Sequence, residues 1–388
     1  MSVLESGSLA ALLTPAHHAL RERARDFFTD ARLAGWREPA NGPLTGRAWR
    51  ELGEAGYLGV SLPTEFGGAG LGVLGSLVLG EAVSRLGDVG LPLGMHVQNE
   101  VACQWLVDAD PVLRAEFLPR LLDGRLVACQ ADTDPSADEP TTAVRDGDDL
   151  VVNGAKLFVI NGAVAGLCFT RVLLDGSPAI VAVDKDRPGV RVAEVYDKLG
   201  TRSADSARLE FTDVRVPATR VVSSGGVGRH LRWNRVMTLL RFLIAADAAL
   251  VHRRLLDRVT RYAGERALGG RPLAAWPVNS HALARFRADL ELVEAGVARA
   301  CARLDAGAWP VPEVAALKWF CVERACALAA ACCDLEGGAG YMWGNPSLRD
   351  LAQLRGLRMA GGSQTTMLTI TNHSFAARAE WDTAGVAR

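Results

Sequence analysis

The residue pattern of this chain changes twice, and that change constrains the fold more than any other feature of the sequence. From about Ala16 to Leu122, apolar residues recur at intervals of three and four, the spacing of amphipathic helices. Between about Leu126 and Val222, short β-branched runs alternate with Asp-Gly, Asn-Gly and proline turns, which is typical of strands. From about Gly228 onward the chain returns to long segments with few prolines. We therefore predict a helical part, a β part and a second helical part in succession.

The expected fold class is α+β. It has an N-terminal helical domain over residues 1–125, a central antiparallel β-barrel-like domain over 126–226 and a C-terminal helical bundle over 227–388. Helices and strands are segregated along the chain, whereas a Rossmann domain requires them to alternate. With 388 residues, of which 49% are hydrophobic, the chain can bury the cores of two or three domains. The longest C-terminal helices are expected over residues 231–262, 278–304 and 311–335.

The charge balance disfavours several kinds of partner. The 43 basic and 44 acidic residues give a net charge of -1, which leaves no electrostatic footprint for nucleic acid or for an anionic membrane. The N-terminus lacks a basic region followed by an apolar one, and no run of about 18 apolar residues occurs. We expect a cytoplasmic protein without membrane attachment, whose ligand is a small molecule or another protein.

Cysteine and histidine spacing gives no sign of a metal site. The eight cysteines include no Cys-x-x-Cys pair, and the seven histidines form no cluster with metal-ligand spacing. Five of the cysteines fall in alanine-rich stretches with a helical pattern. Reduced, buried cysteines are expected, and no metal.

Eight motifs in a fixed order carry a resemblance to a known family. They are PTEFGGAGL (63–71), FLPRLLDG (117–124), NGAKLFVING (153–162), KLGTRSAD (198–205), FTDVRVP (211–217), YAGER (262–266), GGAGY (337–341) and RMAGGSQTTML (358–368). In order and spacing they are similar to motifs of the acyl-CoA dehydrogenase family, and the resemblance covers nearly the whole chain. It implies FAD in a cleft between the β domain and the C-terminal helices, completed by a neighbouring subunit of a homodimer or homotetramer.

The resemblance also assigns residues to the cofactor. They are Thr133, Phe158, Ile160, Arg266, Gly337, Gly338 and Ser363. Thr133 is expected to contact the flavin pyrimidine, with the Phe158 ring and the backbone around Ile160 beside the isoalloxazine. Arg266 is expected to reach the FAD pyrophosphate across the subunit interface, where a guanidinium suits phosphate oxygens. The Gly-Gly turn is expected to let main chain approach the cofactor closely.

The family's catalytic base is missing from both of its usual positions. One is a Glu in the closing motif, replaced here by Gly361, and the other is a Glu on the first long C-terminal helix, replaced by Leu240 beside a retained Arg241. Since a positioned base contributes roughly 10²- to 10⁴-fold, ordinary α,β-desaturation requires a substitute. The candidate catalytic residues are Glu100, Asp132 and Arg241. Desolvation beside the flavin is expected to raise the pKa of Asp132.

Polar residues also stand where the family has an apolar acyl pocket. One face of a predicted helix carries His96, Asn99, Glu100 and Cys103. Two interpretations are open: the face is solvated, or it lines the pocket and Arg241 or a polar substrate neutralises Glu100. Asp247 lies inside an apolar helical segment. It is either on the solvent-exposed side of its helix or a functional acid.

Further departures concern the flavin. Glu139 and Pro140 stand in place of a Ser-Asp pair near the flavin phosphates, where a carboxylate is unfavourable unless the loop turns outward. Ile160 replaces a threonine, while Pro277 and Asp334 each replace a glutamine. These differences predict FAD binding that is weaker than usual or differently arranged.

Three functions compete on this sequence. The leading hypothesis is FAD-dependent oxidation of a small polar acyl thioester, tethered to a carrier protein in preference to coenzyme A, in building-unit or secondary-metabolite biosynthesis. The second is a flavin monooxygenase of the same fold, which does not need the thioester base. The third is a non-redox descendant that binds ligands or serves as a scaffold. An electron-transfer protein or a flavin reductase is the expected protein partner of the redox forms.

Overall fold

The computed structural model describes residues 3–5, 7–39 and 42–373, which form two compact units. The helical unit combines residues up to Arg25, Leu77–Val89 and residues from Arg241 on. The sheet unit combines Asp26–Ser76 and Gly90–Leu240. Each unit therefore takes residues from both sides of the predicted β segment.

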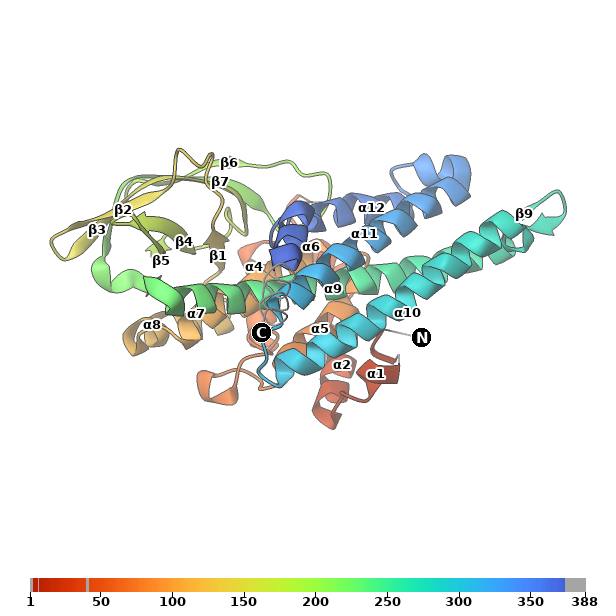
Figure 1. The fold of residues 1–388 in the computed structure, drawn as a ribbon, viewed down its shortest axis with the longest axis horizontal. Coiled ribbons are helices and arrows are strands. Elements are labelled where there is room, and N and C mark those ends of the chain that lie inside the picture. The colour runs from red at the N-terminus through yellow and green to blue at the C-terminus, as the bar shows by residue number, and fades with distance from the viewer. Residues whose placement is uncertain (1–2, 6, 40–41, 374–388) are drawn as a thin grey trace, which may run out of the picture. The chain divides into compact units, whose positions relative to one another are not determined.

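The sheet unit is built on one eight-stranded sheet with the order β6-β7-β3-β2-β4-β5-β8, and β1 lies beside β4 (Figure 1). The strands are β1 Ala128–Ala131, β2 Thr142–Asp146, β3 Asp149–Ile160, β4 Leu167–Leu174, β5 Ser177–Asp184, β6 Val190–Val195, β7 Ser206–Pro217 and β8 Val221–Ser224. Most neighbours are antiparallel, which confirms the prediction, but β1 and β2 each pair with β4 in parallel. The central sheet is therefore mostly antiparallel, with two parallel pairs at β4.

Alternation along the strands gives the sheet its core. Leu150 and Val152 of β3 are fully buried and pair with Val216 and Val214 of β7, which are fully buried as well. Successive side chains of a strand point to opposite faces, so a one-residue slip would turn these residues to the wrong face. The apolar period therefore fixes the register of β3 against β7.

Short helices complete the sheet unit. They are α3 Asp30–Gly35, α4 Gly46–Glu54, η2 Thr64–Phe66, α6 Gly90–His96, the π-helical turn η3 Val97–Ala102, α7 Cys103–Val107, α8 Pro111–Leu122 and η4 Ala218–Arg220. The π-helical turn interrupts what would otherwise be one helix from α6 to α7. Such turns are rare and frequently occur at functional sites.

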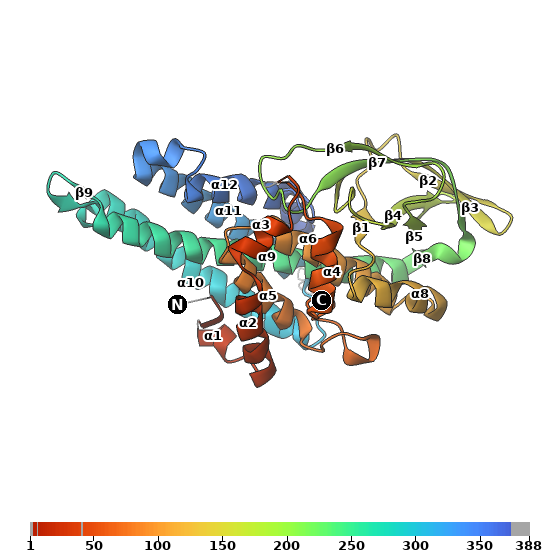
Figure 2. The same cartoon turned by 180° about the vertical axis from the view of Figure 1, so that it is seen from behind.

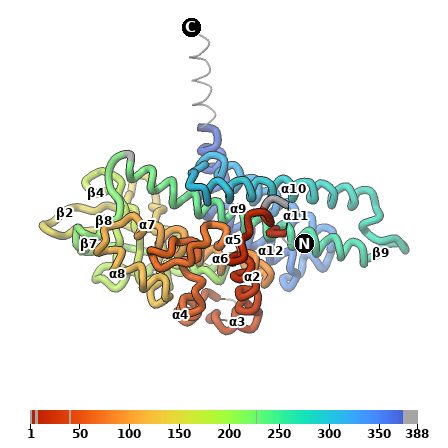
Figure 3. Tube along the Cα trace, turned by 90° about the horizontal axis from the view of Figure 1, so that it is seen from below, coloured from red at the N-terminus to blue at the C-terminus, as the bar shows by residue number. Residues whose placement is uncertain are grey.

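The helical unit contains the three long helices expected from the sequence. Its elements are η1 Val3–Glu5, α1 Gly7–Ala10, β9 Ala267–Leu268, β10 Arg271–Pro272, η5 Leu273–Ala275, α10 Pro277–Asp305, α11 Val311–Glu336, η6 Gly337–Tyr341 and α12 Pro346–Leu357, with parts of α2 Pro15–Phe27, α5 Gly72–Ser84 and α9 Gly226–Glu265. The helices α9 and α10 run side by side from the β9–β10 hairpin that joins them, as Figure 2 and Figure 3 show from two sides. Among the described residues, no helix has the length and apolarity needed to cross a bilayer.

Buried ion pairs connect the long helices. Arg253 of α9 donates through Nε to Glu294 of α10 at 3.0 Å, and Arg258 of α9 pairs with Glu336 of α11 at 2.6 Å. Removing one partner of such a pair strands a buried charge, so these contacts specify which helix faces which. All eight cysteines are free, and all except Cys333 are buried, as expected.

Candidate functional site

A bulge in β3 presents an aromatic side chain to solvent. The pairing of β3 with β7 shifts between Lys156 and Val159, and Phe158, which lies between them, has a φ of 54°. Its ring is 63% exposed and lies 5.0 Å from the ring of Tyr196. A bulky residue with positive φ is strained, and bulges of this kind occur beside active sites. The exposed ring is an apolar surface that suits a flat conjugated ligand.

Two other flavin candidates lie close to this bulge. Thr133 is exposed and forms an isolated bridge with Leu157, whose N–H donates to the Thr133 carbonyl at 2.8 Å. Ile160 is half-buried at the end of β3 and pairs with Ser206 of β7. The structure thus brings together the three flavin candidates that the sequence placed in the β segment.

Asp132 precedes Thr133 and is held by a chain of hydrogen bonds. Gln130 Nε2 donates to Asp132 Oδ1 at 2.7 Å, and Trp105 Nε1 donates to Gln130 Oε1 at 2.7 Å. The residue keeps some exposed surface, but its carboxyl group lies among enough protein atoms that burial raises its pKa to about 6. A carboxyl group with a pKa near neutral can accept and return a proton at physiological pH.

The loop after Asp132 is anchored by a pair that the sequence reasoning missed. Lys156 is fully buried, and its Nζ donates to Asp134 Oδ1 at 2.6 Å and to the Asp132 carbonyl at 3.2 Å. Thr141 donates to Asp134 through both its backbone N and its Oγ1, at 2.9 Å. A lysine inside an apolar strand was the available signal. Glu139 in the same loop is exposed, which avoids the unfavourable position considered for its carboxylate.

Glu100 is not on a solvated helix face, so that interpretation is wrong. His96, Asn99 and Cys103 are buried with it, and Glu100 itself is fully buried. Ser61 and Ser76 donate their hydroxyls to Glu100 Oε1 at 2.9 and 2.5 Å, and His96 Nδ1 lies 3.6 Å from Oε2. The partner expected from the sequence was Arg241 or a substrate, and the structure supplies serine hydroxyls instead.

The other members of this face serve the fold. Asn99 Oδ1 accepts from the Gly59 N–H at 3.0 Å, and its Nδ2 donates to the Tyr57 carbonyl at 3.3 Å. Burial raises the pKa of the Cys103 thiol, which keeps it protonated and unreactive. Asn99 therefore ties the π-helical turn to the segment around Gly59, and Cys103 is a buried, protonated thiol.

The closing motif lies in the helical unit, after α12. Gly361 and Gly362 have φ values of 65° and 105°, which favour glycine. Arg241 Nε donates to the Gly361 carbonyl at 2.9 Å, and Lys318 Nζ donates to the Gly362 carbonyl. Leu240, at the second family position of the base, is buried. Arg241 and Lys318 therefore hold the main chain at Gly361 and Gly362.

These cations lie in a strongly electropositive environment. Arg241 is 7% exposed and Lys318 is fully buried. Burial lowers the pKa of Arg241 to about 10, and burial together with Arg241 and Arg358 lowers the pKa of Lys318 to about 7. Arg358 pairs with Glu323 at 2.6 Å. Within residues 3–373 as the structure describes them, no carboxylate pairs with Arg241 or Lys318.

The remaining flavin candidates of the helical unit have open surroundings. Gly337 and Gly338 are exposed, and a Cβ on either would meet no atom within 4 Å. Arg266 is exposed where α9 ends. Ser363 starts the helical stretch 364–373, because its Oγ accepts from the Thr366 N–H at 3.2 Å.

Asp247 also needs a correction. It is only 4% exposed, so it does not lie on the solvent-exposed side of α9. A Cβ placed on Gly80 of α5 would lie 3.1 Å from its Oδ1, which shows how closely α5 approaches this carboxylate. Pro277 and Asp334 are exposed.

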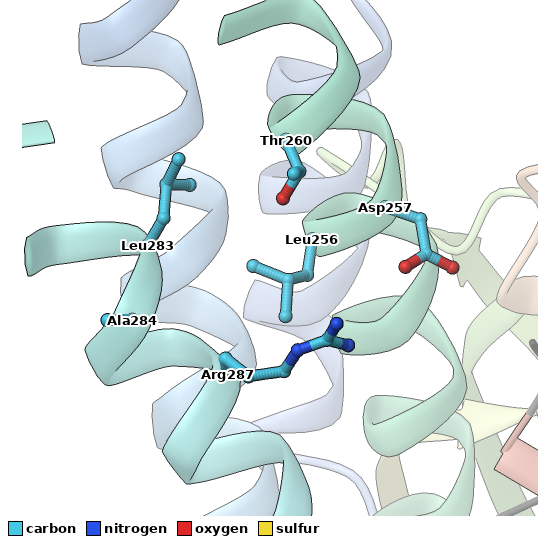
Figure 4. A pocket seen from close by; sticks show the side chains of 6 residues that line it. All are labelled: Leu256, Asp257, Thr260, Leu283, Ala284 and Arg287. Atoms are coloured by element: carbon cyan, nitrogen blue, oxygen red, sulfur yellow. The ribbon is translucent and has the colours of Figure 1, made fainter. Parts of the chain in front are cut away.

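A pocket of about 350 Å³ lies between α9 and α10 (Figure 4). It is lined by Leu256, Asp257, Thr260, Leu283, Ala284 and Arg287. None of the residues assigned to FAD or to catalysis contributes to it. Among the described residues, no group of three or more His, Cys, Asp and Glu side chains is placed to hold a metal ion.

Family models for the N-terminal, middle and C-terminal domains of acyl-CoA dehydrogenase match residues 14–125, 129–214 and 228–375. The chain belongs to the acyl-CoA dehydrogenase family. A mitochondrial isovaleryl-CoA dehydrogenase from Oryza sativa subsp. japonica is 28% identical over 327 residues, which cover 81% of this chain and 79% of the relative. The probable acyl-CoA dehydrogenase YngJ of Bacillus subtilis is 26% identical over 85% of this chain and 90% of its own length.

Solved structures show the same fold. An acyl-CoA dehydrogenase from Geobacillus kaustophilus superposes with a TM-score of 0.87 at 25% identity, over 94% of this chain and 98% of its own. A glutaryl-CoA dehydrogenase from Mycobacterium smegmatis, solved with FADH2, gives 0.85 at 23% identity over 97% and 98%. The prolyl acyl carrier protein oxidase AnaB gives 0.83 at 21% identity over 94% and 99%.

Members of this family bind FAD and oxidise acyl thioesters, and this chain is an FAD-dependent oxidoreductase. Within each unit taken by itself, residues that the resemblance assigns to FAD have surroundings that suit part of the cofactor. The exposed Phe158 ring suits the flat isoalloxazine, the open main chain at Gly337 permits close approach, and the exposed guanidinium of Arg266 suits a pyrophosphate. When bound, FAD accepts the electrons that leave the substrate.

Proposed function

We propose that this protein oxidises a small polar acyl thioester and that Asp132 accepts the proton that leaves the substrate. The supporting observation is the position of Asp132 between Gln130 and Thr133, with a pKa raised by burial to about 6. The family's own base positions hold Gly361 and Leu240, which carry no proton acceptor. Asp132 is therefore the carboxylate next to a flavin candidate that can take over the role.

Glu100 is the weaker candidate for proton transfer. Its side chain is fully buried, and one of its oxygens already accepts from Ser61 and Ser76. A general base must come within hydrogen-bond reach of the proton that it removes. We assign Glu100 to the polar interior of the sheet unit and Asp132 to the chemistry.

We further propose that an acyl carrier protein, in preference to coenzyme A, carries the acyl thioester. We call this carrier the thioester handle. Support comes from the exposed loop around Glu139, where the sequence departs from the family's Ser-Asp pair; the resemblance places that pair near the flavin phosphates and also near the thioester arm of the substrate. The fold is compatible with this handle, since AnaB, which shares it, is a prolyl acyl carrier protein oxidase.

Anaerobic flavin bleaching tests the reaction and the handle together. FAD-loaded protein is mixed with short hydroxy-, amino- and alkyl-acyl thioesters, each on coenzyme A and on a carrier protein. We expect a polar acyl group on the carrier protein to bleach the flavin fastest. Faster bleaching by every free coenzyme A ester would contradict the carrier assignment, and no bleaching of stoichiometrically loaded protein would contradict the oxidation.

One observation favours a second candidate, a flavin monooxygenase. Gly361 and Leu240 provide no carboxylate. This suits a protein in which reduced flavin reacts with oxygen, because that reaction needs no thioester base. Reduction by a flavin reductase, followed by oxygen-dependent hydroxylation of a substrate, would identify this activity. Failure to retain FAD after reconstitution would instead indicate a non-redox descendant.

A further inference from the structure

The arginines of α9 in the helical unit differ in whether they pair with a carboxylate. Four of them are buried or half-buried, and three of these pair with a carboxylate of another helix. The pairs are Arg253 with Glu294, Arg254 with Asp350, and Arg258 with Glu336. The fourth, Arg241, is 7% exposed and pairs with no carboxylate of the described chain. The helix therefore neutralises its buried guanidinium groups, except at the closing motif.

The partners of Arg241 do not replace a carboxylate. Its Nε binds the Gly361 carbonyl, and the neighbouring Lys318 binds the Gly362 carbonyl. A carbonyl oxygen carries only a partial charge, whereas a buried guanidinium requires a full negative charge to offset its desolvation. The positive charge of Arg241 also lowers the pKa of the neighbouring Lys318, so neither side chain neutralises the other.

The geometry leaves a place for that negative charge. Nε is the only nitrogen of Arg241 that binds protein in the residues the structure describes, so both terminal nitrogens remain for a ligand. A guanidinium presents its nitrogens in a planar fork that matches the two oxygens of a carboxylate. Gly361, whose carbonyl accepts from Arg241, carries no side chain that could supply the charge.

We propose that the acyl group of the substrate carries a carboxylate and that Arg241 binds it beside Gly361. The inference rests on the proposed oxidation and names its substrate class. Lys318 is a positioning residue here, because it is fully buried and holds the Gly362 carbonyl. A neutral acyl chain would leave the guanidinium of Arg241 without a counter-charge.

Binding to reduced protein tests the inference without turnover. FAD-loaded protein is reduced with dithionite and titrated anaerobically by calorimetry with succinyl-pantetheine and butyryl-pantetheine, which match in chain length and differ in charge. We expect the succinyl thioester to bind about 10- to 100-fold more tightly, as a hydrogen-bonded charge pair provides. Equal affinity, or binding of neither thioester, would overturn the assignment.

Variants test whether the preference for the succinyl thioester depends on Arg241. Arg241→Gln is expected to remove the preference for succinyl, and Arg241→Lys to restore part of it. Arg299→Gln is the matched control, because its side chain is 72% exposed on α10, and it should keep the full preference. A preference that survives Arg241→Gln would contradict the proposal.

Gly361→Glu provides an independent test that keeps the arginine. The new carboxylate should neutralise Arg241 and erase the preference for succinyl, with folding checked by circular dichroism. Persistence of the preference in the folded variant would count against the site. Bleaching of oxidised protein by thioesters regardless of charge would leave the proposed oxidation standing and reject the carboxylate. If the protein prefers the succinyl thioester but no thioester bleaches the flavin, the carboxylate site stands and the proposed oxidation is rejected.

Discussion

Single residues in this chain hold buried charge in three different ways. Lys156 pairs directly with Asp134, Glu100 accepts hydrogen bonds from two serines, and Arg241 binds a single carbonyl within the described part of the chain. The first arrangement satisfies the charged group within the protein, the second leaves Oε2 of Glu100 without a hydrogen-bond partner among the described residues, and the third leaves a deficit that a ligand can fill. The candidate chemistry therefore lies at Asp132 and Arg241, and Glu100 belongs to the structure.

Replacement of Asp132 by Asn is expected to slow flavin reduction by roughly 10²- to 10⁴-fold, because the proton acceptor is lost. In the unchanged protein the rate should rise with pH through about 6, where the carboxyl group ionises. Stopped-flow measurements from pH 5 to pH 8 would show both effects. A variant that keeps the wild-type rate and pH profile would refute the role of Asp132.

The same substitution should stabilise the fold at neutral pH. The unfolded carboxyl group ionises near pH 4 and the folded one near pH 6, so the native state bears the cost of a buried charge above pH 6. Asp132→Asn is expected to raise the free energy of unfolding by about 1–3 kcal/mol at pH 7 and by less at pH 4. Urea titrations at the two pH values measure the difference, and equal effects would contradict the burial argument.

Glu100→Gln is expected to leave flavin reduction unchanged, because the amide oxygen still accepts from Ser61 and Ser76. Ser76→Ala, in contrast, should destabilise the protein by about 1.5–3 kcal/mol, since a charged buried acceptor loses a donor. Bleaching rates and urea unfolding separate the two effects. A loss of more than about 100-fold in the bleaching rate of Glu100→Gln would return Glu100 to the catalytic residues.

At the scale of elements, α9 links the helical unit through its arginines. Arg253→Met should cost about 3–5 kcal/mol, because it removes the guanidinium that pairs with the buried Glu294. Arg241→Met should cost less than about 1 kcal/mol or stabilise the protein, because no carboxylate is stranded. Denaturant unfolding of the two apoproteins compares them directly, and a large loss in both would reveal a protein partner of Arg241.

At the scale of the whole molecule, we expect a homodimer or homotetramer that completes each FAD site. Tyr341, Met342 and Trp343 are 83%, 57% and 60% exposed, an apolar run of the kind that marks an interface. Trp343→Lys should lower the molar mass of the protein, measured by light scattering.

Arg266→Ala should weaken FAD binding about 10-fold and leave the stability of the apoprotein unchanged. A wild-type protein that is monomeric with full FAD occupancy would contradict both expectations.

The sequence by itself determined the order of helical and β segments and the family motifs, and it predicted the loss of both carboxylates at Gly361 and Leu240. These features are local, because periodicity and turn residues act over a few neighbouring positions. Only the tertiary structure decided what surrounds each charge. Ser76 meets Glu100 across 24 residues, and Arg241 meets Gly361 across 120. Periodicity shows which face of an element is apolar, but packing of distant segments decides whether a polar residue on that face finds a partner.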